Sequence, residues 1–201
     1  MQTEVHELTG FNNVGRWKNK KQIILTHTSR DGAEYVTSLK TRHNGKYMKV
    51  PHYLIRKDGR VFQLLDPEMY SDYLKDYKNQ KQTIVITLEN LGWLKKNPLN
   101  ASYINWIGNI YSEGVYERKW RGHFFWDPYT DSQMDSLQQL CVDLCERFEI
   151  PKTCIGHNVK VDGIERFEGI VTRSNYTTDS TDLSPAFDFD EYKKIFENEP
   201  I

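Results

Sequence analysis

The stretches TCIGHN (residues 153–158) and STDLSPAFDF (residues 180–189) decide how this chain folds. The first ends a short apolar run with His157, and the second places Asp182 shortly before a proline turn. An imidazole and a carboxylate both bind divalent metal ions, but two ligands do not complete a site. We therefore expect the rest of the fold to bring a further ligand to His157 and Asp182.

The best candidate for the third ligand is His27, at the end of the apolar run QIILTH (residues 22–27). A continuous apolar run of this kind predicts a strand in the buried centre of a sheet. His27 would emerge at the edge where sites form in open α/β sheets. Two imidazoles and one carboxylate with one open position are a zinc arrangement suited to hydrolysis. The sequence thus predicts a metal site made by His27, His157 and Asp182.

Each candidate ligand also has a simpler structural explanation. A histidine at a strand end is often a core side chain held by hydrogen bonds, and an aspartate such as Asp182 often bonds its own backbone in a turn. Two strand-end histidines together with Asp182 favour metal binding over these explanations. His52, which begins a hairpin pattern, is more consistent with a packing or supporting role than with ligation.

Length and charge restrict the function. A chain of 201 residues suits one domain and can bury a substantial core without disulfides. Its 27 basic and 28 acidic residues give a net charge of -1, so no nucleic-acid-binding surface is indicated. The mean hydropathy of -0.72 argues against a membrane span. We expect a monomer whose partner is neither nucleic acid nor a lipid bilayer.

The three cysteines do not suggest a disulfide framework. Cys141 and Cys145 are four residues apart in a helical pattern, which is typical of small core residues in a protein made in a reducing compartment. The opening residues MQTEVH lack the basic and apolar segments of a secretory signal. We therefore expect cytoplasmic synthesis, with delivery by another factor if the substrate lies outside the cytoplasm.

The remaining patterns predict an α/β domain preceded by a polar and basic N-terminal arm over residues 1–21. The expected elements after the strand at residues 22–27 share clear boundary signals. They are a helix from Asp31 to the Asn44-Gly45 stop, a hairpin over residues 52–65 around a Lys-Asp-Gly turn, a central strand over residues 83–89, a helix opened by the capping box Thr130–Gln133, and a short terminal helix capped by Asp188.

Residues 95–127 have no clean period but contain Trp106, Trp120, Trp126 and several tyrosines. We interpret them as an aromatic-rich insertion that packs over the domain or lines a groove. Its rings could stack on the faces of sugars. The need of a long loop for large apolar anchors explains them equally well.

These elements, in this order, resemble the zinc-dependent N-acetylmuramoyl-L-alanine amidases, a family that shares its fold with peptidoglycan recognition proteins. The resemblance runs over about residues 22–192 and is carried by a strand ending in HTS, the HYLIRKDG hairpin, the IVITLEN strand, the YTDSQ helix start, GH and TDLSPAFD. It implies one catalytic domain over residues 22–201, with a mixed central sheet flanked by helices. It also implies zinc bound by His27, His157 and Asp182.

The sequence departs from the family pattern at three positions. A catalytic tyrosine before the hairpin histidine is replaced by Pro51, a glutamate in the IVITL strand by Thr87, and a lysine shortly before the third ligand by Ser180. Because alternate residues share one face of a strand, Glu89 faces the same way as Thr87 and is the nearest acid that could serve as the catalytic acid/base. Lys160 is a weaker candidate for a cation supplied by a loop.

The resemblance implies hydrolysis of the amide between N-acetylmuramic acid and L-alanine in peptidoglycan or muropeptides. Zinc would polarise the carbonyl and lower the pKa of bound water toward about 7. Such an enzyme would be a phage lysin released through a holin-type pore, or a cytosolic enzyme that recycles wall fragments. Two alternatives keep the fold without catalysis: a peptidoglycan-binding module, favoured by the three replacements, and a phage structural protein. The intact ligand set favours the enzyme.

Overall fold

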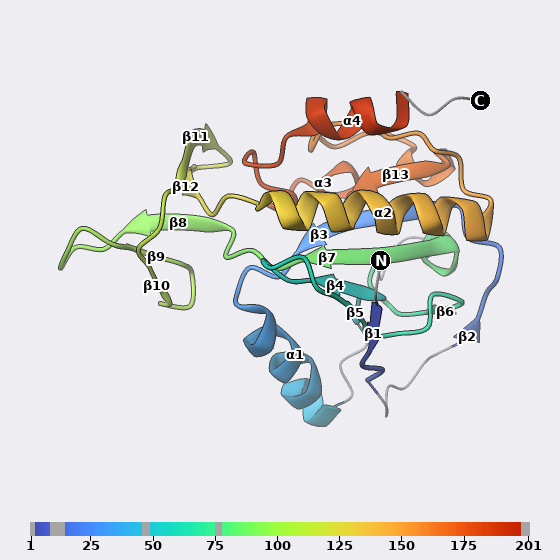
Figure 1. Ribbon diagram of the computed structural model, residues 1–201, viewed down its shortest axis with the longest axis horizontal. Helices are drawn as coiled ribbons and strands as arrows, with labels where there is room; N and C mark the ends of the chain where they lie inside the picture. Colours follow the sequence, from blue (N-terminus) through green and yellow to red (C-terminus); the bar gives the residue numbers. More distant parts are fainter. Residues whose placement is uncertain (1–2, 9–14, 46–48, 75–77, 198–201) are drawn as a thin grey trace.

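The computed structural model describes residues 3–8, 15–45, 49–74 and 78–197. A six-stranded sheet forms the central layer, with the strand order β1-β5-β4-β7-β3-β13 (Figure 1). Its strands are β1 (Thr3–Val5), β3 (Gln22–His27), β4 (Tyr53–Ile55), β5 (Val61–Gln63), β7 (Thr83–Leu88) and β13 (Gly169–Thr172). Strands β4, β7, β3 and β13 run parallel, and β5 is antiparallel to β4. The predicted α/β domain with a mixed central sheet is confirmed.

Strand β3 is apolar throughout because both faces of the sheet are covered there. Ile23 and Leu25 belong to the core under helix α2 (Asp131–Phe148), whereas Ile24 packs with Tyr73 on the opposite face. Every residue of β3 is buried, and the strand pairs with β7 along its whole length. This register brings His27 to the carboxyl edge of the parallel strands, as the sequence predicts.

Helix α2 (Asp131–Phe148) covers one face of the sheet (Figure 1). The capping box predicted at its start is present, because the side chains of Thr130 and Gln133 each accept from the other's backbone N–H. Helix α4 (Phe189–Glu197) packs against α2, where the Tyr192 hydroxyl donates to the Cys141 Sγ at 3.1 Å. Cys141 and Cys145 are free, buried thiols, as expected.

Helix α1 (Gly32–Thr41) covers the opposite side of the sheet near β4, where Leu39 and Leu54 share a buried cluster. The Asp31 side chain accepts from two backbone N–H groups and so caps the helix. The remaining helical segments are short: 3-10 turns at Arg42–Gly45, Lys78–Gln82 and Ile164–Arg166, and α3 (Arg173–Tyr176). None of the helices described is both long and apolar enough to cross a membrane.

The predicted hairpin is formed by β4 and β5, and Gly59 takes a positive φ of 84° in its turn. Parts of the N-terminal arm are also folded. Strand β1 pairs in parallel with β5, and β2 (Gly15–Arg16) pairs with β6 (Met69–Tyr70). The described parts of the arm therefore extend the sheets of the domain.

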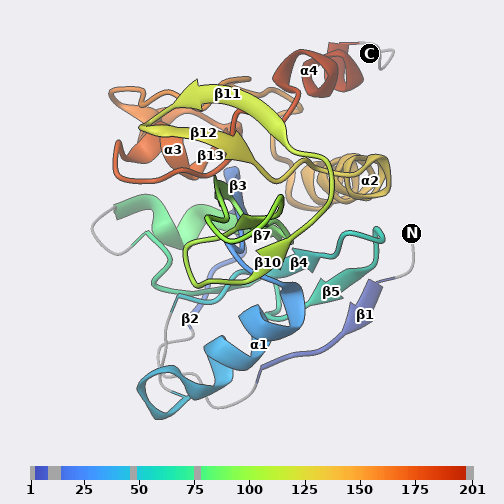
Figure 2. The ribbon, with the colours of Figure 1, turned by 90° about the vertical axis from the view of Figure 1, so that its left-hand side faces the viewer.

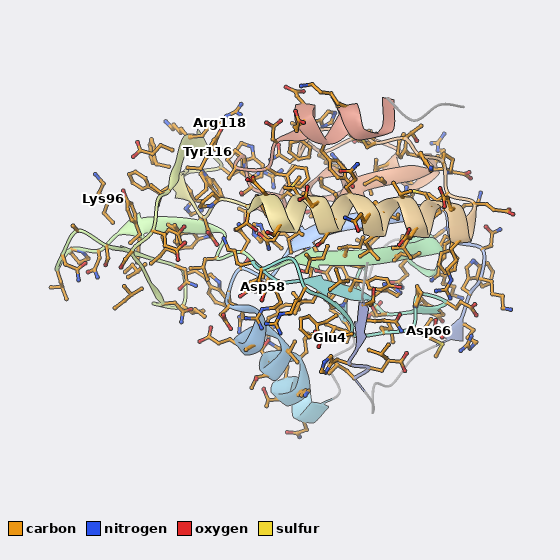
Figure 3. All side chains as sticks on the ribbon, viewed as in Figure 1. Glu4, Asp58, Asp66, Lys96, Tyr116 and Arg118 are labelled. Carbon is orange, nitrogen blue, oxygen red and sulfur yellow. The ribbon has the colours of Figure 1, made fainter. Side chains whose placement is uncertain are left out.

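Residues 93–126 form a second, antiparallel sheet, called here the side sheet, with the order β10-β9-β8-β12-β11. It extends from one end of the central sheet (Figures 1 and 2), and Lys96, Tyr116 and Arg118 lie on it (Figure 3). Its strands are β8 (Trp93–Lys96), β9 (Tyr103–Ile104), β10 (Ile110–Tyr111), β11 (Tyr116–Trp120) and β12 (His123–Trp126). Such short strands, with a register shift between Glu117 and Trp120, give no clean period in the sequence.

Candidate functional site

The structure brings two of the predicted ligands, His27 and Asp182, into contact at the carboxyl edge of β3. The His27 Nε2 lies 3.3 Å from the Asp182 Oδ1, and both side chains are almost fully buried. In the tautomer that can bind a metal through Nε2, the Nδ1–H of His27 donates to the Tyr129 hydroxyl at 3.0 Å. Burial lowers the pKa of His27, so its imidazole stays neutral, which is the form that binds metal ions.

The geometry of this pair fits a shared zinc ion. The His27 Nε2 is buried and has no hydrogen-bond partner in the described part of the chain, so its lone pair is unused. Two ligand atoms on one tetrahedral zinc, each with a bond of about 2.0 to 2.1 Å, lie about 3.3 Å apart. The distance between the Nε2 of His27 and the Oδ1 of Asp182 matches this separation.

Asp182 is held in place by a chain of hydroxyl groups. The buried Thr26 hydroxyl donates to the Asp182 Oδ2, and the Tyr73 hydroxyl donates to the Thr26 Oγ1 at 3.3 Å. The backbone N–H of Asp182 donates to the Ser180 Oγ at 3.1 Å. Ser180, at the position where the family has a lysine, therefore positions the backbone of Asp182. Such support fixes the orientation of a ligating carboxylate.

His157 lies on a loop with its side chain exposed. No three metal-ligating side chains gather anywhere in the described residues. The loop is nevertheless tied to the site, because Asn158 Nδ2 donates to the Leu183 carbonyl and Asn175 Nδ2 donates to the His157 carbonyl, each at 2.8 Å. The ring Nδ1 of His157 accepts from the Val159 N–H at 3.3 Å. Its ligand role stays a prediction.

A cavity of about 200 Å³ opens over His27 and Asp182 and is strongly cationic. Of the described side chains that line it, Arg30, Arg42, Lys49 and Arg173 are basic and Asp182 alone is acidic. The Arg173 Nη1 lies 3.4 Å from the Asp182 Oδ2. A pocket with this balance suits a substrate that carries negative charge or develops it during reaction.

Arg173 is a site residue that the sequence reasoning missed. It directly follows β13, whose Thr172 pairs with Leu25 of β3, so Arg173 reaches the same sheet edge as His27. The available signal was the short apolar run Ile170-Val171, which marks a buried strand. None of the elements expected from the sequence covers residues 169–173, so the strand and the arginine at its end were not predicted.

Glu89 does not line the pocket around His27. Its Oε1 accepts from the Gly32 N–H at 3.0 Å, and its Oε2 accepts from the Lys57 N–H at 3.1 Å and from the Arg56 Nε. Arg56 in turn lines a larger cavity of about 530 Å³ between the N-terminal segment and α1. The assignment of Glu89 as the acid/base stays a prediction, and these contacts favour a structural role.

Replacing Glu89 by glutamine distinguishes a catalytic role of this carboxylate from a structural one. We expect the free energy of unfolding, measured by urea denaturation, to fall by about 3 kcal/mol, because Arg56 loses its largely buried anionic partner. Turnover per folded molecule should be unchanged. The matched control is Asp58→Asn, which breaks an exposed pair with Arg60 and should change stability by at most about 1 kcal/mol. Lost turnover at unchanged stability would instead make Glu89 catalytic.

Two further residues named from the sequence are His52, expected to pack or to support the site, and Lys160, the weaker candidate for a loop cation. His52 is buried, its Nδ1 accepts from the Val85 N–H at 2.8 Å, and burial lowers its pKa to about 3. It therefore packs as a neutral imidazole between strands. The exposed Lys160 lies 3.8 Å from Asp162. Arg173 is thus the better candidate for a cation beside Asp182.

Comparison with known proteins identifies the family. Residues 16–175 match the family model described as N-acetylmuramoyl-L-alanine amidase. A comparison with curated proteins found no match. The family model spans well over half of the chain and includes His27 and His157, and it ends before Asp182.

Solved structures of low sequence identity share the fold. The N-acetylmuramoyl-L-alanine amidase LysC from Clostridium intestinale aligns with a TM-score of 0.60 and 13% identity over 99% of each chain. AmpDh3 from Pseudomonas aeruginosa, in complex with an anhydromuramic pentapeptide, aligns with a TM-score of 0.56 and 18% identity over 90% of this chain and 61% of its own. The hydrolase AmiA from Staphylococcus aureus aligns with a TM-score of 0.58 and 10% identity, covering 98% and 82% of the two chains.

Proposed function

Because this chain belongs to the N-acetylmuramoyl-L-alanine amidase family, we propose that it hydrolyses the amide between N-acetylmuramic acid and L-alanine in peptidoglycan or its fragments. The observation that carries the proposal is the buried His27 Nε2, which has no hydrogen-bond partner among the described residues and lies 3.3 Å from the Asp182 Oδ1. Both residues line the cavity of about 200 Å³ in which we place the scissile amide.

His27 and Asp182 would hold a zinc ion with His157 as the third ligand. The hydrogen bonds that tie the His157 loop to Leu183 and Asn175 support this assignment, because Leu183 directly follows Asp182 in the chain. When bound, zinc polarises the scissile carbonyl and acidifies the attacking water. Tyr129 would orient His27 through its Nδ1, which is the usual role of a second contact on a ligating histidine.

Arg173 would stabilise the negative charge that develops on the carbonyl oxygen. Its guanidinium lines the pocket beside Asp182, so it supplies a positive charge next to the reacting carbonyl in this proposal. Hydrolysis forms a bond from the water oxygen to the lactyl carbonyl carbon and breaks the carbon–nitrogen bond. Both protons of the water pass to the nitrogen of L-alanine, so the products are a lactyl carboxylate and an ammonium group. Arg173 would thereby replace the lysine that is absent at Ser180.

The charge of the pocket supports a muropeptide substrate. Stem peptides carry free carboxylates, and the basic side chains of Arg30, Arg42 and Lys49 lie on the walls of the pocket around the proposed zinc position. These cations would attract the peptide part of the substrate and speed its association.

The product masses test this function. The protein is incubated with a disaccharide-tetrapeptide of known structure, and the products are analysed by mass spectrometry. We expect the free disaccharide with its lactyl carboxylate and a peptide that begins with L-alanine. Cleavage of a glycosidic or a peptide–peptide bond would contradict the proposal. We include in this proposal that the protein acts as an endolysin. In that case a suspension of insoluble sacculi should lose turbidity when the protein is added.

A peptidoglycan-binding module is the second candidate, and a specific observation favours it. Glu89, the acid nearest to Thr87 on the strand, is engaged by Arg56 and two backbone N–H groups. A binder would retain muropeptides in equilibrium dialysis and leave them uncleaved with zinc present.

A further inference from the structure

The turn between β9 and β10 carries the side sheet to the edge of the pocket around His27. Trp106, in this turn, lines the same cavity as His27 and Asp182. Trp106 is 48% exposed, although its indole N–H is hydrogen-bonded and a guanidinium packs on one face of the ring. A large aromatic ring that is fixed but left half in water contributes little to a core, so another use for the ring is expected.

Two contacts hold the indole of Trp106 beside the proposed zinc ligands. Its Nε1–H donates to the Ser29 carbonyl at 2.8 Å, and Ser29 follows His27 by two residues. The guanidinium of Arg30 lies over the indole ring, 5.1 Å from its centroid. The ring is thus coupled to the segment that leaves β3, and a shift of the turn would also move the walls of the pocket.

Hydrogen bonds within the turn and to α1 fix its shape. The Asn105 Oδ1 accepts from the N–H groups of Ile107 and Asn109, at 3.2 and 2.8 Å. The Asn109 Nδ2 donates to the Glu34 Oε1 on α1 at 3.2 Å, which docks the turn on the main body. Figure 2 shows the β10 end of the side sheet close to α1. Because the turn that carries Trp106 is already fixed, it loses little conformational entropy when a ligand binds to it.

We propose that Trp106 and Arg30 form the subsite for the pyranose ring of N-acetylmuramic acid. This inference rests on the proposed amidase function. The C–H face of the sugar would stack on the exposed part of the indole, and the Arg30 guanidinium would donate to the acetamido or lactyl oxygens. The ring lies at the edge of the pocket that holds His27, so a sugar stacked there presents its lactyl amide to the zinc position. The stem peptide has no comparable flat face.

Calorimetry with a peptide-free ligand tests the subsite. The titrant is the disaccharide of N-acetylglucosamine and N-acetylmuramic acid, and the proteins are the wild type, Trp106→Ala and Trp106→Phe. We expect Trp106→Ala to weaken binding about tenfold, as for the loss of a well-packed aromatic anchor, with Trp106→Phe in between. With the disaccharide-tetrapeptide as substrate, Trp106→Ala should raise KM while kcat stays close to the wild-type value.

The control is Phe124→Ala, which removes another exposed ring of the side sheet, 52% accessible and placed on β12 outside the lining of the pocket. It should bind the disaccharide like the wild type. Equal affinities for Trp106→Ala, Phe124→Ala and the wild type would overturn the subsite while cleavage by the wild type still stood. Weakened binding of free stem peptide with unchanged binding of the disaccharide would also overturn it. A wild type that cleaves no muropeptide would refute the amidase function separately, and the disaccharide titration would still decide the subsite.

Discussion

Replacement of His157 by alanine abolishes zinc retention and amide cleavage if His157 is the third ligand. With His27 and Asp182 alone, two ligands remain, and two ligands do not hold a catalytic zinc. Loss of the metal should lower turnover by at least about a thousandfold, since a bound metal ion is worth several kcal/mol of transition-state stabilisation. Zinc content is measured by inductively coupled plasma mass spectrometry and turnover by release of peptide.

The exposure of His157 makes this substitution a clean test. Its side chain is exposed, and within the described ranges its ring makes one hydrogen bond, to the Val159 N–H. Alanine should therefore leave the melting temperature of the metal-free protein nearly unchanged. The control is His6→Ala, because His6 is also exposed and sits beside Glu4 on the N-terminal segment. Full zinc occupancy in the His157→Ala protein would remove His157 from the ligand set.

Arg173→Ala is expected to lower kcat by about a hundredfold while zinc stays bound. The guanidinium lies 3.4 Å from the Asp182 Oδ2 and lines the pocket, where removal of one preorganised donor to the developing oxyanion typically lowers the rate by about 10² to 10³. Removal of a cation next to Asp182 does not weaken the attraction of that carboxylate for a metal ion. The zinc content should therefore match that of the wild type.

Two further variants separate this role from a structural one. Arg173→Lys keeps the positive charge and should recover part of kcat, although lysine lacks the planar fork of arginine. Arg166→Ala removes an exposed arginine from the nearby 3-10 turn Ile164–Arg166 and should leave kcat unchanged. Wild-type kcat in the Arg173→Ala protein would exclude Arg173 from the reaction and leave the charge stabilisation to other groups.

The sequence predicts those parts of the fold in which local signals and burial agree. The continuous apolar run before His27 corresponds to β3, which is buried on both faces, and the turn at Gly59 joins β4 to β5. The capping box at Thr130 opens α2. In each case the local sequence signal agrees with the burial or the backbone conformation that the fold requires at that position. The element and its place in the fold therefore follow from the sequence.

The parts that escaped prediction depend on contacts between distant residues. Strand alternation alone places Glu89 on the same face as Thr87, but its pairing with Arg56 across 33 residues decides what the carboxylate does. The strands of the side sheet are two to five residues long, too short for periodicity to reveal them. Trp106 reaches the pocket only because this sheet folds back onto α1. Such arrangements are set by tertiary packing.

Cleavage of a muropeptide before and after chelation tests the central claim, a zinc-dependent amidase at His27, His157 and Asp182, most directly. The protein is stripped of metal, assayed by mass spectrometry for peptides that begin with L-alanine, and assayed again after stoichiometric zinc is added. The account predicts cleavage by the untreated protein, none after stripping, and recovery with zinc. Cleavage that survives complete removal of the metal, or a zinc-loaded protein that binds the muropeptide and never cleaves it, would contradict it.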